Sequence, residues 1–318
     1  MSALASTGVQ MAHLVIRQYS PEASIVDAVR LLNHCYADSP GFSPLTMEEL
    51  ERLRTDGRLR PELFLTAYLD GEPVGLCMAF LRQGDTRGWL DRLGVLPGYR
   101  RRGVARALLK QCVENLRDAG AQELLARSVE LGDLKARSLL ESEGFKEAYR
   151  QLLMVRDLAS PLPDYVLPQP YRVRTLKPRE GEAWLRVRNE AFRNELIASR
   201  PWTLEDFRRE FVDSPYAGRG RIFAVEHLGE VVGVAAAWYM HYRGVEREIV
   251  HWLGVLAPHR RRGVGQALVL EALRFFQERG SKEARLITQS ALPNAVRLYR
   301  KLGFTVERES VIYSRPVT

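Results

Sequence analysis

The chain has 318 residues, with little cysteine and no long hydrophobic run. Cys35, Cys77 and Cys112 are its three cysteines, and their spacing excludes a zinc cluster or a disulfide framework. The longest apolar stretch, residues 231–240, is far shorter than the ~20 residues that a membrane-spanning helix needs. The N-terminal segment has no lysine or arginine before Arg17 and no long apolar core, so we expect no secretory signal. These absences favour a cytoplasmic protein without a metal site or membrane association.

Lysine is scarce as well, although the chain is basic. Only six of its 47 basic residues are lysines, and the formal net charge is +8. An arginine-rich, positive chain suits an anionic ligand such as a phosphate compound, a nucleic acid or an acidic surface. A solvated basic surface without a ligand explains the same charge. The hydrophobic share of 46% is typical of globular proteins and excludes a disordered chain.

The sequence contains an internal duplication. Short segments of the first half recur in the second at a nearly constant offset, as when 46–52 recurs at 203–209. Four prolines fall within residues 159–170, which favours an extended spacer without regular structure. We therefore predict an N-terminal domain at 1–158, a linker at 159–170 and a C-terminal domain at 171–318.

Each half has the pattern of a mixed α/β domain. A strand and helices come first, then a hairpin, and a fourth strand follows the hairpin. The next segment has apolar residues at helical spacing, as at Val104, Leu108 and Leu116. A strand, a helix and a final strand complete the unit. The repeated pattern predicts two α/β domains of the same fold.

One motif occurs in both halves between a predicted strand and a predicted helix. It reads RRRGVA at 100–105 and RRRGVG at 260–265. The N-terminus of a helix carries partial positive charge, so three arginines there are unfavourable for stability alone. A phosphate group in the turn would explain them, because glycine lets the main chain approach the phosphate oxygens. We therefore predict an anion-binding turn in each half.

At these residues the chain resembles the GNAT (GCN5-related N-acetyltransferase) superfamily, whose pyrophosphate loop reads Arg/Gln-x-x-Gly-x-Gly/Ala. The second half also matches the later family signature at Asn294, Tyr299, Gly303 and Phe304. The resemblance covers both halves nearly end to end, and the tandem layout is similar to that of the mycothiol synthases. It implies two GNAT-type domains, each with a mixed, mostly antiparallel central sheet flanked by helices.

The resemblance also implies acetyl-CoA as the cofactor and direct transfer of its acetyl group to a primary amine, with a small-molecule acceptor favoured. Main-chain groups at the end of the fourth strand would hold the pantetheine arm, and the arginine turn would hold the pyrophosphate. The implied cofactor-binding residues of the second half are Leu253, Gly254, Val255, Arg260, Arg261, Arg262, Gly263, Val264, Gly265, Gln266 and Asn294. Those of the first half are Leu93, Val95, Arg100, Arg101, Arg102, Gly103, Val104 and Ala105.

Acetyl transfer to an amine needs a base for the amine proton and an acid for the departing thiolate. The resemblance makes Tyr299 the acid, although its spacing from Val296 and Leu302 also fits simple packing. His251 is one candidate base, because its position on the strand matches the family and an ordinary histidine pKa is about 6.5. Glu248 is the other candidate, one residue out of phase unless a bulge intervenes.

The first half departs from the family pattern. Leu140 stands where the second half has Tyr299, and leucine cannot donate a proton. The first half therefore either binds CoA without turnover, uses another acid, or is purely structural. Asp91 stands where the second half has His251, and its carboxylate could bind a cationic amine. We predict that the N-terminal domain is degenerate and the C-terminal domain catalytic.

Two other functions remain open. One is a CoA-binding regulatory or structural protein without turnover, although Asn294 and Tyr299 would then be unnecessary. The other is an acetyltransferase acting on a protein or RNA-associated target, but no nucleic-acid-binding module is recognisable, so nucleic acid is an unlikely partner. We expect a monomer or a homodimer.

No motif identifies the acceptor. The segments near 36–60 and 192–220 would shape its pocket. Four aromatic side chains fit either an acceptor cleft or the core: Trp202, Tyr216, Trp238 and Tyr242.

Overall fold

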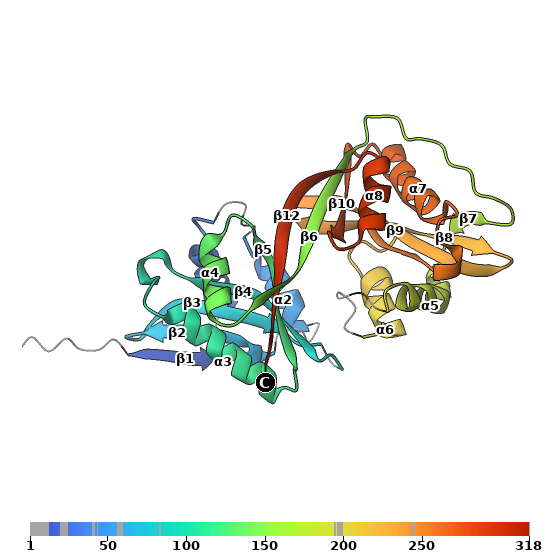
Figure 1. Ribbon diagram of the computed structural model, residues 1–318. Helices are drawn as coiled ribbons and strands as arrows, with labels where there is room; N and C mark the ends of the chain where they lie inside the picture. Colours follow the sequence, from blue (N-terminus) through green and yellow to red (C-terminus); the bar gives the residue numbers. More distant parts are fainter. Residues whose placement is uncertain are drawn as a thin grey trace, which may run out of the picture. The chain divides into compact units, whose positions relative to one another are not determined.

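The computed structural model describes residues 13–19, 25–39, 42, 44–55, 60–82, 84–193, 195, 200–242 and 245–317. The chain forms two compact units (Figure 1). Unit 1 consists of Met1–Arg127, Lys135–Lys146 and Tyr313–Thr318. Unit 2 consists of Ser128–Leu134 and Glu147–Ile312. The units therefore do not follow the two halves of the sequence, because the strand that ends each half contributes to the unit of the other.

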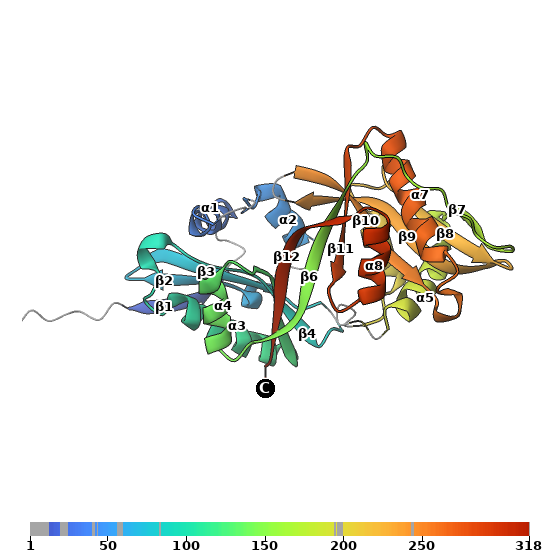
Figure 2. The ribbon, with the colours of Figure 1, turned by 45° about the horizontal axis from the view of Figure 1, so that its top comes forward.

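Unit 1 is built on a sheet with the strand order β1-β2-β3-β4-β5. Pairing is antiparallel from β1 to β4 and parallel between β4 and β5. Helices α1 and α2 lie on one side of this sheet and α3 and α4 on the other (Figure 2). The elements are β1 (Leu14–Gln18), α1 (Ile25–Cys35), α2 (Met47–Thr55), β2 (Phe64–Leu69), β3 (Glu72–Phe80), β4 (Arg87–Val95), α3 (Val104–Asp118), β5 (Glu123–Glu130) and α4 (Leu134–Ser142).

Unit 2 repeats this arrangement with the strand order β12-β6-β11-β10-β9-β8-β7. Strands β10 and β11 are parallel, and β11 pairs with β6 in the antiparallel direction. Helices α5 and α6 lie on one side of the sheet and α7 and α8 on the other (Figure 1). The elements are β6 (Lys146–Asp157), β7 (Arg172–Thr175), α5 (Gly181–Ala191), α6 (Leu204–Phe207), β8 (Arg221–His227), β9 (Glu230–Tyr242), β10 (Val245–Val255), α7 (Val264–Glu278), β11 (Glu283–Gln289), α8 (Pro293–Lys301) and β12 (Thr305–Pro316).

Two apolar clusters hold the unit 2 sheet between its helices. Trp184 of α5 is fully buried in the cluster on the α5 and α6 side. Leu268 of α7 is equally buried in the cluster on the other side, together with Tyr299 of α8. The prediction of a mixed, mostly antiparallel sheet flanked by helices is confirmed.

The proline-rich segment packs against unit 2 and has no regular structure over residues 161–168. The Tyr165 hydroxyl donates a hydrogen bond of 2.8 Å to Glu271 of α7. Asp164 forms an ion pair of 3.2 Å with Arg274, one turn further along α7. These contacts hold the segment along α7. Among the described helices none combines the length and apolar character needed to cross a membrane.

Candidate active site

The two RRRG motifs form turns of the same geometry. A short 3-10 turn, Ala257–His259, leads into the motif in unit 2, and α7 begins directly after Gly263. Gly263 has a φ of 83°, and Gly103 has a φ of 81° at the start of α3. This left-handed conformation favours glycine, since other residues adopt it only with strain. Arg261 shares the left-handed region at 62°. The main chain thus coils at each helix N-terminus, where amide groups are available to an anion.

The strand before each turn separates from its parallel neighbour. In unit 2 the register between β10 and β11 contains the single pair Ile249 and Arg285. In unit 1 the pairing of β4 with β5 ends at Leu90. A bulge follows in β10, where Trp252 has a φ of 54°. Beyond Ile249, the main chain of β10 up to Val255 does not pair with β11. An extended chain with amide groups can therefore form hydrogen bonds with it there. Pantetheine is such a chain.

Helix α8, which carries the predicted acid, packs against the first turn of α7. Gly265, in the first turn of α7, lies against Leu298, since a Cβ at this glycine would be 3.4 Å from the leucine Cδ2. Tyr299 is the next residue on α8 and is 7% exposed, with its ring 6.0 Å from that of Phe304. Burial raises the pKa of the Tyr299 hydroxyl well above its ordinary value. It therefore carries its proton at neutral pH, as an acid must. Asn294 is exposed in the first turn of the same helix.

The two candidate bases face different sides of the sheet. Strand neighbours alternate, and Ile249 packs on the α5 and α6 side while Val250 packs on the α7 side. Glu248 lies two residues before Val250 and therefore faces the α7 side. It accepts a hydrogen bond of 2.8 Å from Ser281, just beyond the C-terminus of α7. The arginine turn lies at the N-terminus of this 15-residue helix, about 22 Å away.

His251 lies on the α5 and α6 side beside a carboxylate. Its Nε2 is 3.3 Å from Oε1 of Glu210, which belongs to the π-helical turn Arg208–Val212. The indole of Trp252 donates a hydrogen bond of 3.3 Å to the same oxygen. A carboxylate in this place can accept a hydrogen bond from the imidazole and orient the ring. The sequence provided no sign of Glu210, because its proximity depends on the fold of the 203–212 segment.

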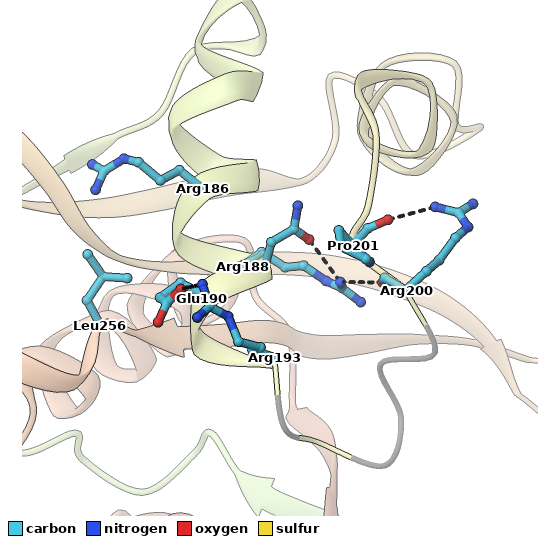
Figure 3. A pocket seen from close by; sticks show the side chains of 8 residues that line it. Arg186, Arg188, Glu190, Arg193, Arg200, Pro201 and Leu256 are labelled. Carbon is cyan, nitrogen blue, oxygen red and sulfur yellow. Dashed lines mark hydrogen bonds and ion pairs between the residues drawn. The ribbon is translucent and has the colours of Figure 1, made fainter. Parts of the chain in front are cut away.

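A cavity of about 550 Å³ opens beside α5 (Figure 3). Arg188 is 1% exposed, and its guanidinium carbon lies 4.6 Å from the Trp202 ring centre and 5.0 Å from that of Trp252. Trp252 also contacts the His251 ring at 4.7 Å. Trp252 thus contacts both His251 and Arg188, and Arg188 lines the cavity. Its lining consists of Arg186, Arg188, Asn189, Glu190, Arg193, Arg200, Pro201 and Leu256.

The predicted acceptor aromatics separate in the structure. Trp202 joins the cluster around Arg188, whereas Trp238 is 5% exposed and belongs to the core. Tyr216 packs beside Tyr239 at 5.8 Å. The side chain of Tyr242 lies outside the described residues. Arg188 is a site residue that the sequence did not predict, since its one signal was an arginine within the apolar spacing of a helix.

In unit 1, the residues that correspond to His251, Tyr299 and Arg260 are Asp91, Leu140 and Arg100, and they have other surroundings. Asp91 forms ion pairs with Arg92 at 3.1 Å and with Arg127 at 3.9 Å, so its carboxylate already faces cations of the chain. Leu140 is buried on α4 at the place of the acid. Arg100 donates to both carboxylate oxygens of Asp38, at 2.5 and 2.7 Å.

The fold and these paired turns define a tandem acyltransferase. The family model "Acetyltransferase (GNAT) family" matches residues 26–145 and 182–304, and the chain belongs to this family. It is an acyl-CoA-dependent N-acetyltransferase. The predicted family and enzyme class are confirmed.

Relatives and solved structures share nearly the whole length. The mycothiol acetyltransferase of Thermobispora bispora is 33% identical over 296 residues, covering 91% of this chain and 95% of that protein. The mycothiol acetyltransferase of Thermomonospora curvata is 32% identical over 289 residues, covering 87% and 89%. The GCN5-related N-acetyltransferase from Sphaerobacter thermophilus has the same fold at a TM-score of 0.71, with 22% identity and 96% of each chain covered. A tandem GNAT protein from the clavulanic acid biosynthesis pathway aligns at 0.70, with 16% identity, covering 96% of this chain and 99% of that one.

Proposed function

We propose that the protein is a cytoplasmic enzyme that transfers the acetyl group of acetyl-CoA to a primary amine of a small molecule. One site, in the C-terminal domain 171–318, carries the reaction, and the N-terminal domain 1–158 is degenerate. The observation that carries this proposal is the packing of α8, which bears the buried Tyr299, against the first turn of α7, where Leu298 lies next to Gly265. The similarity to mycothiol acetyltransferases over 91% of the chain favours a small-molecule acceptor.

The residues of unit 2 fit acetyl-CoA. The left-handed Gly263 and the exposed arginines beside it would hold the pyrophosphate. Main-chain groups of Leu253 to Val255, past the end of the parallel pairing, would hold the pantetheine arm. Bound there, acetyl-CoA supplies an activated acetyl thioester. Asn294, at the start of α8, would contact the cofactor next to the turn.

The protein's own side chains would then move two protons. His251 would accept the proton of the attacking amine, and Glu210 at 3.3 Å would orient its imidazole ring. Tyr299 would give its hydroxyl proton to the departing thiolate. The raised pKa of Tyr299 keeps the proton on its hydroxyl until the reaction generates a thiolate, and solvent returns a proton to the hydroxyl afterwards. Glu248 faces the other side of the sheet, and we propose no step for it.

Replacing Tyr299 by phenylalanine tests the acid role. We expect turnover to fall about a hundredfold, since a positioned acid contributes 10²–10⁴-fold, while affinity for acetyl-CoA stays nearly unchanged. Release of free CoA thiol in the presence of amine acceptors measures turnover, and calorimetric titration measures affinity. The ring fills the same space in both variants, so folding is preserved. Unchanged turnover would remove Tyr299 from the mechanism.

Paired substitutions distinguish the two candidate bases. His251→Ala is expected to lower turnover about a hundredfold, and Glu248→Gln to leave it within about twofold. Both residues belong to β10, so Glu248→Gln controls for any general disturbance of the strand. The same thiol-release assay reports both. A loss of turnover confined to Glu248→Gln would reverse the assignment. Acetyl-CoA binding without turnover for any amine tested would instead favour the regulatory alternative.

A further inference from the structure

Unit 1 contains an internal contact at the strand position that the proposed function assigns to the cofactor arm in unit 2. Tyr36 follows the last residue of α1. Its hydroxyl donates a hydrogen bond to the carbonyl oxygen of Leu93 and accepts one from the Leu93 amide, each at 2.9 Å. Leu93 lies beyond Leu90, where the pairing of β4 with β5 ends. One hydroxyl therefore satisfies both main-chain groups of Leu93.

Unit 2 has a phenylalanine at the same place. Phe192 follows α5 as Tyr36 follows α1. A Cβ at Gly94 would lie 3.0 Å from Cε2 of Tyr36, and a Cβ at Gly254 would lie 3.4 Å from Cε2 of Phe192. The two rings thus cover equivalent glycines in the same manner. Phenylalanine has no hydroxyl, and within the described part of the chain no side chain bonds the main chain of Leu253.

A second contact holds the tyrosine in place. Besides its paired bonds to Asp38, Arg100 donates one of 2.8 Å to the carbonyl of Cys35, the last residue of α1. Arg100, the first arginine of the unit 1 turn, thereby links the turn to Cys35 and Asp38, which lie before and after Tyr36 in the chain. Arg100 and its counterpart Arg260 both donate a hydrogen bond to the carbonyl of the valine that ends the strand, at 3.0 Å to Val95 and 2.9 Å to Val255, so the bonds to Cys35 and Asp38 are additional to this shared contact. Hydrogen bonding to Arg100 lowers the pKa of Asp38, so this ion pair is formed at neutral pH.

The tyrosine stays protonated, as its double role requires. Burial raises the pKa of the Tyr36 hydroxyl to about 12, against a smaller opposing effect of its bond to Leu93. A neutral hydroxyl donates one hydrogen bond and accepts another at once. Both contacts to Leu93 therefore persist throughout the physiological pH range.

We propose that Tyr36 acts as a plug in unit 1. Its hydroxyl occupies the main-chain groups of Leu93, which correspond to those of Leu253 at the acyl end of the proposed cofactor slot in unit 2. Acetyl-CoA therefore binds only in unit 2. Phe192 is then the residue that keeps the second slot open. This inference rests on the proposed function, because the slot is defined by where unit 2 would hold acetyl-CoA. A cofactor entering unit 1 must break two hydrogen bonds, which weakens binding about thirtyfold at a typical net value for each bond, so unit 1 stays empty at acetyl-CoA concentrations that fill unit 2.

Reciprocal one-atom substitutions test the plug by calorimetric titration of the full chain with acetyl-CoA. The native protein should bind one equivalent, and Tyr36→Phe should bind two. Phe192→Tyr should weaken the single native site at least about tenfold. Against the background of Gly263→Glu, which we expect to bind none, the added Tyr36→Phe should restore one equivalent. Thermal unfolding of each variant confirms that the fold is retained.

The outcomes separate this inference from the proposed function. Two equivalents on the native protein, or a single one on Tyr36→Phe, would overturn the plug and leave the acetyltransferase of unit 2 intact. An unchanged affinity of Phe192→Tyr would also overturn it. No binding by the native protein would instead overturn the proposed function itself.

Discussion

Gly263→Glu is expected to abolish acetyl-CoA binding in unit 2, with at least about a thousandfold loss of affinity. The φ of 83° is left-handed, so any side chain there carries strain of about 1–2 kcal/mol. Space is not the obstacle, since a Cβ would meet the Val166 carbonyl at an ordinary 3.5 Å. The larger effect is electrostatic, because a carboxylate would replace the anion at the N-terminus of α7. Turnover should disappear with binding.

The duplicated chain offers a matched control for this variant. Gly103→Glu places the same charge at the same φ in unit 1. It should leave acetyl-CoA affinity and turnover within about twofold of the native values. Gly263→Ala adds the strain without the charge and should lose much less affinity than Gly263→Glu. Full binding by Gly263→Glu would show that the pyrophosphate is held elsewhere.

Deleting residues 313–318 is expected to unfold unit 1, although these residues end the chain. Tyr313 and Val317 are each 1% exposed. The Val317 amide donates a hydrogen bond of 3.0 Å to the Gln122 carbonyl, and Arg117 donates one of 2.8 Å to the Val317 carbonyl. Burial of the two side chains stabilises by about 1.5–3 kcal/mol each, and the hydrogen bonds add about 1 kcal/mol each. The loss of roughly 5 kcal/mol or more compares with 5–15 kcal/mol for a whole domain.

Hydrogen exchange resolved along the chain measures this effect. Amides of α3 and β5 should lose their protection in the shortened protein, while those of α7 keep theirs. The substitution Val306→Ala is the control, because this residue lies in the same strand β12 but is 41% exposed and belongs to unit 2. Unchanged protection of α3 after the deletion would mean that unit 1 is stable without the C-terminal strand. The same reasoning predicts that a fragment cut at 158 lacks part of unit 1.

The sequence by itself determined the duplication, the fold class and the family. These depend on short-range signals. Helical periodicity appears in each half as the same spacing of apolar residues around Leu108 and Leu268, and both helices occur as predicted. The arginine turns carry their anomaly locally, because a cation beside a helix N-terminus is unfavourable whatever the rest of the chain does. The roles of Tyr299 and His251 remain predictions that depend on the family resemblance.

Only the tertiary structure decided which strand completes which unit. β6 ends the first half of the sequence yet pairs with β11 of the second. Because the two halves are related, either closing strand suits either sheet by pattern, and local sequence cannot choose between them. The contacts by which the two sites differ also join residues that are far apart in the sequence. Tyr36 meets Leu93 across 57 residues and Glu210 meets His251 across 41, so neither pair has a spacing that a sequence pattern could reveal.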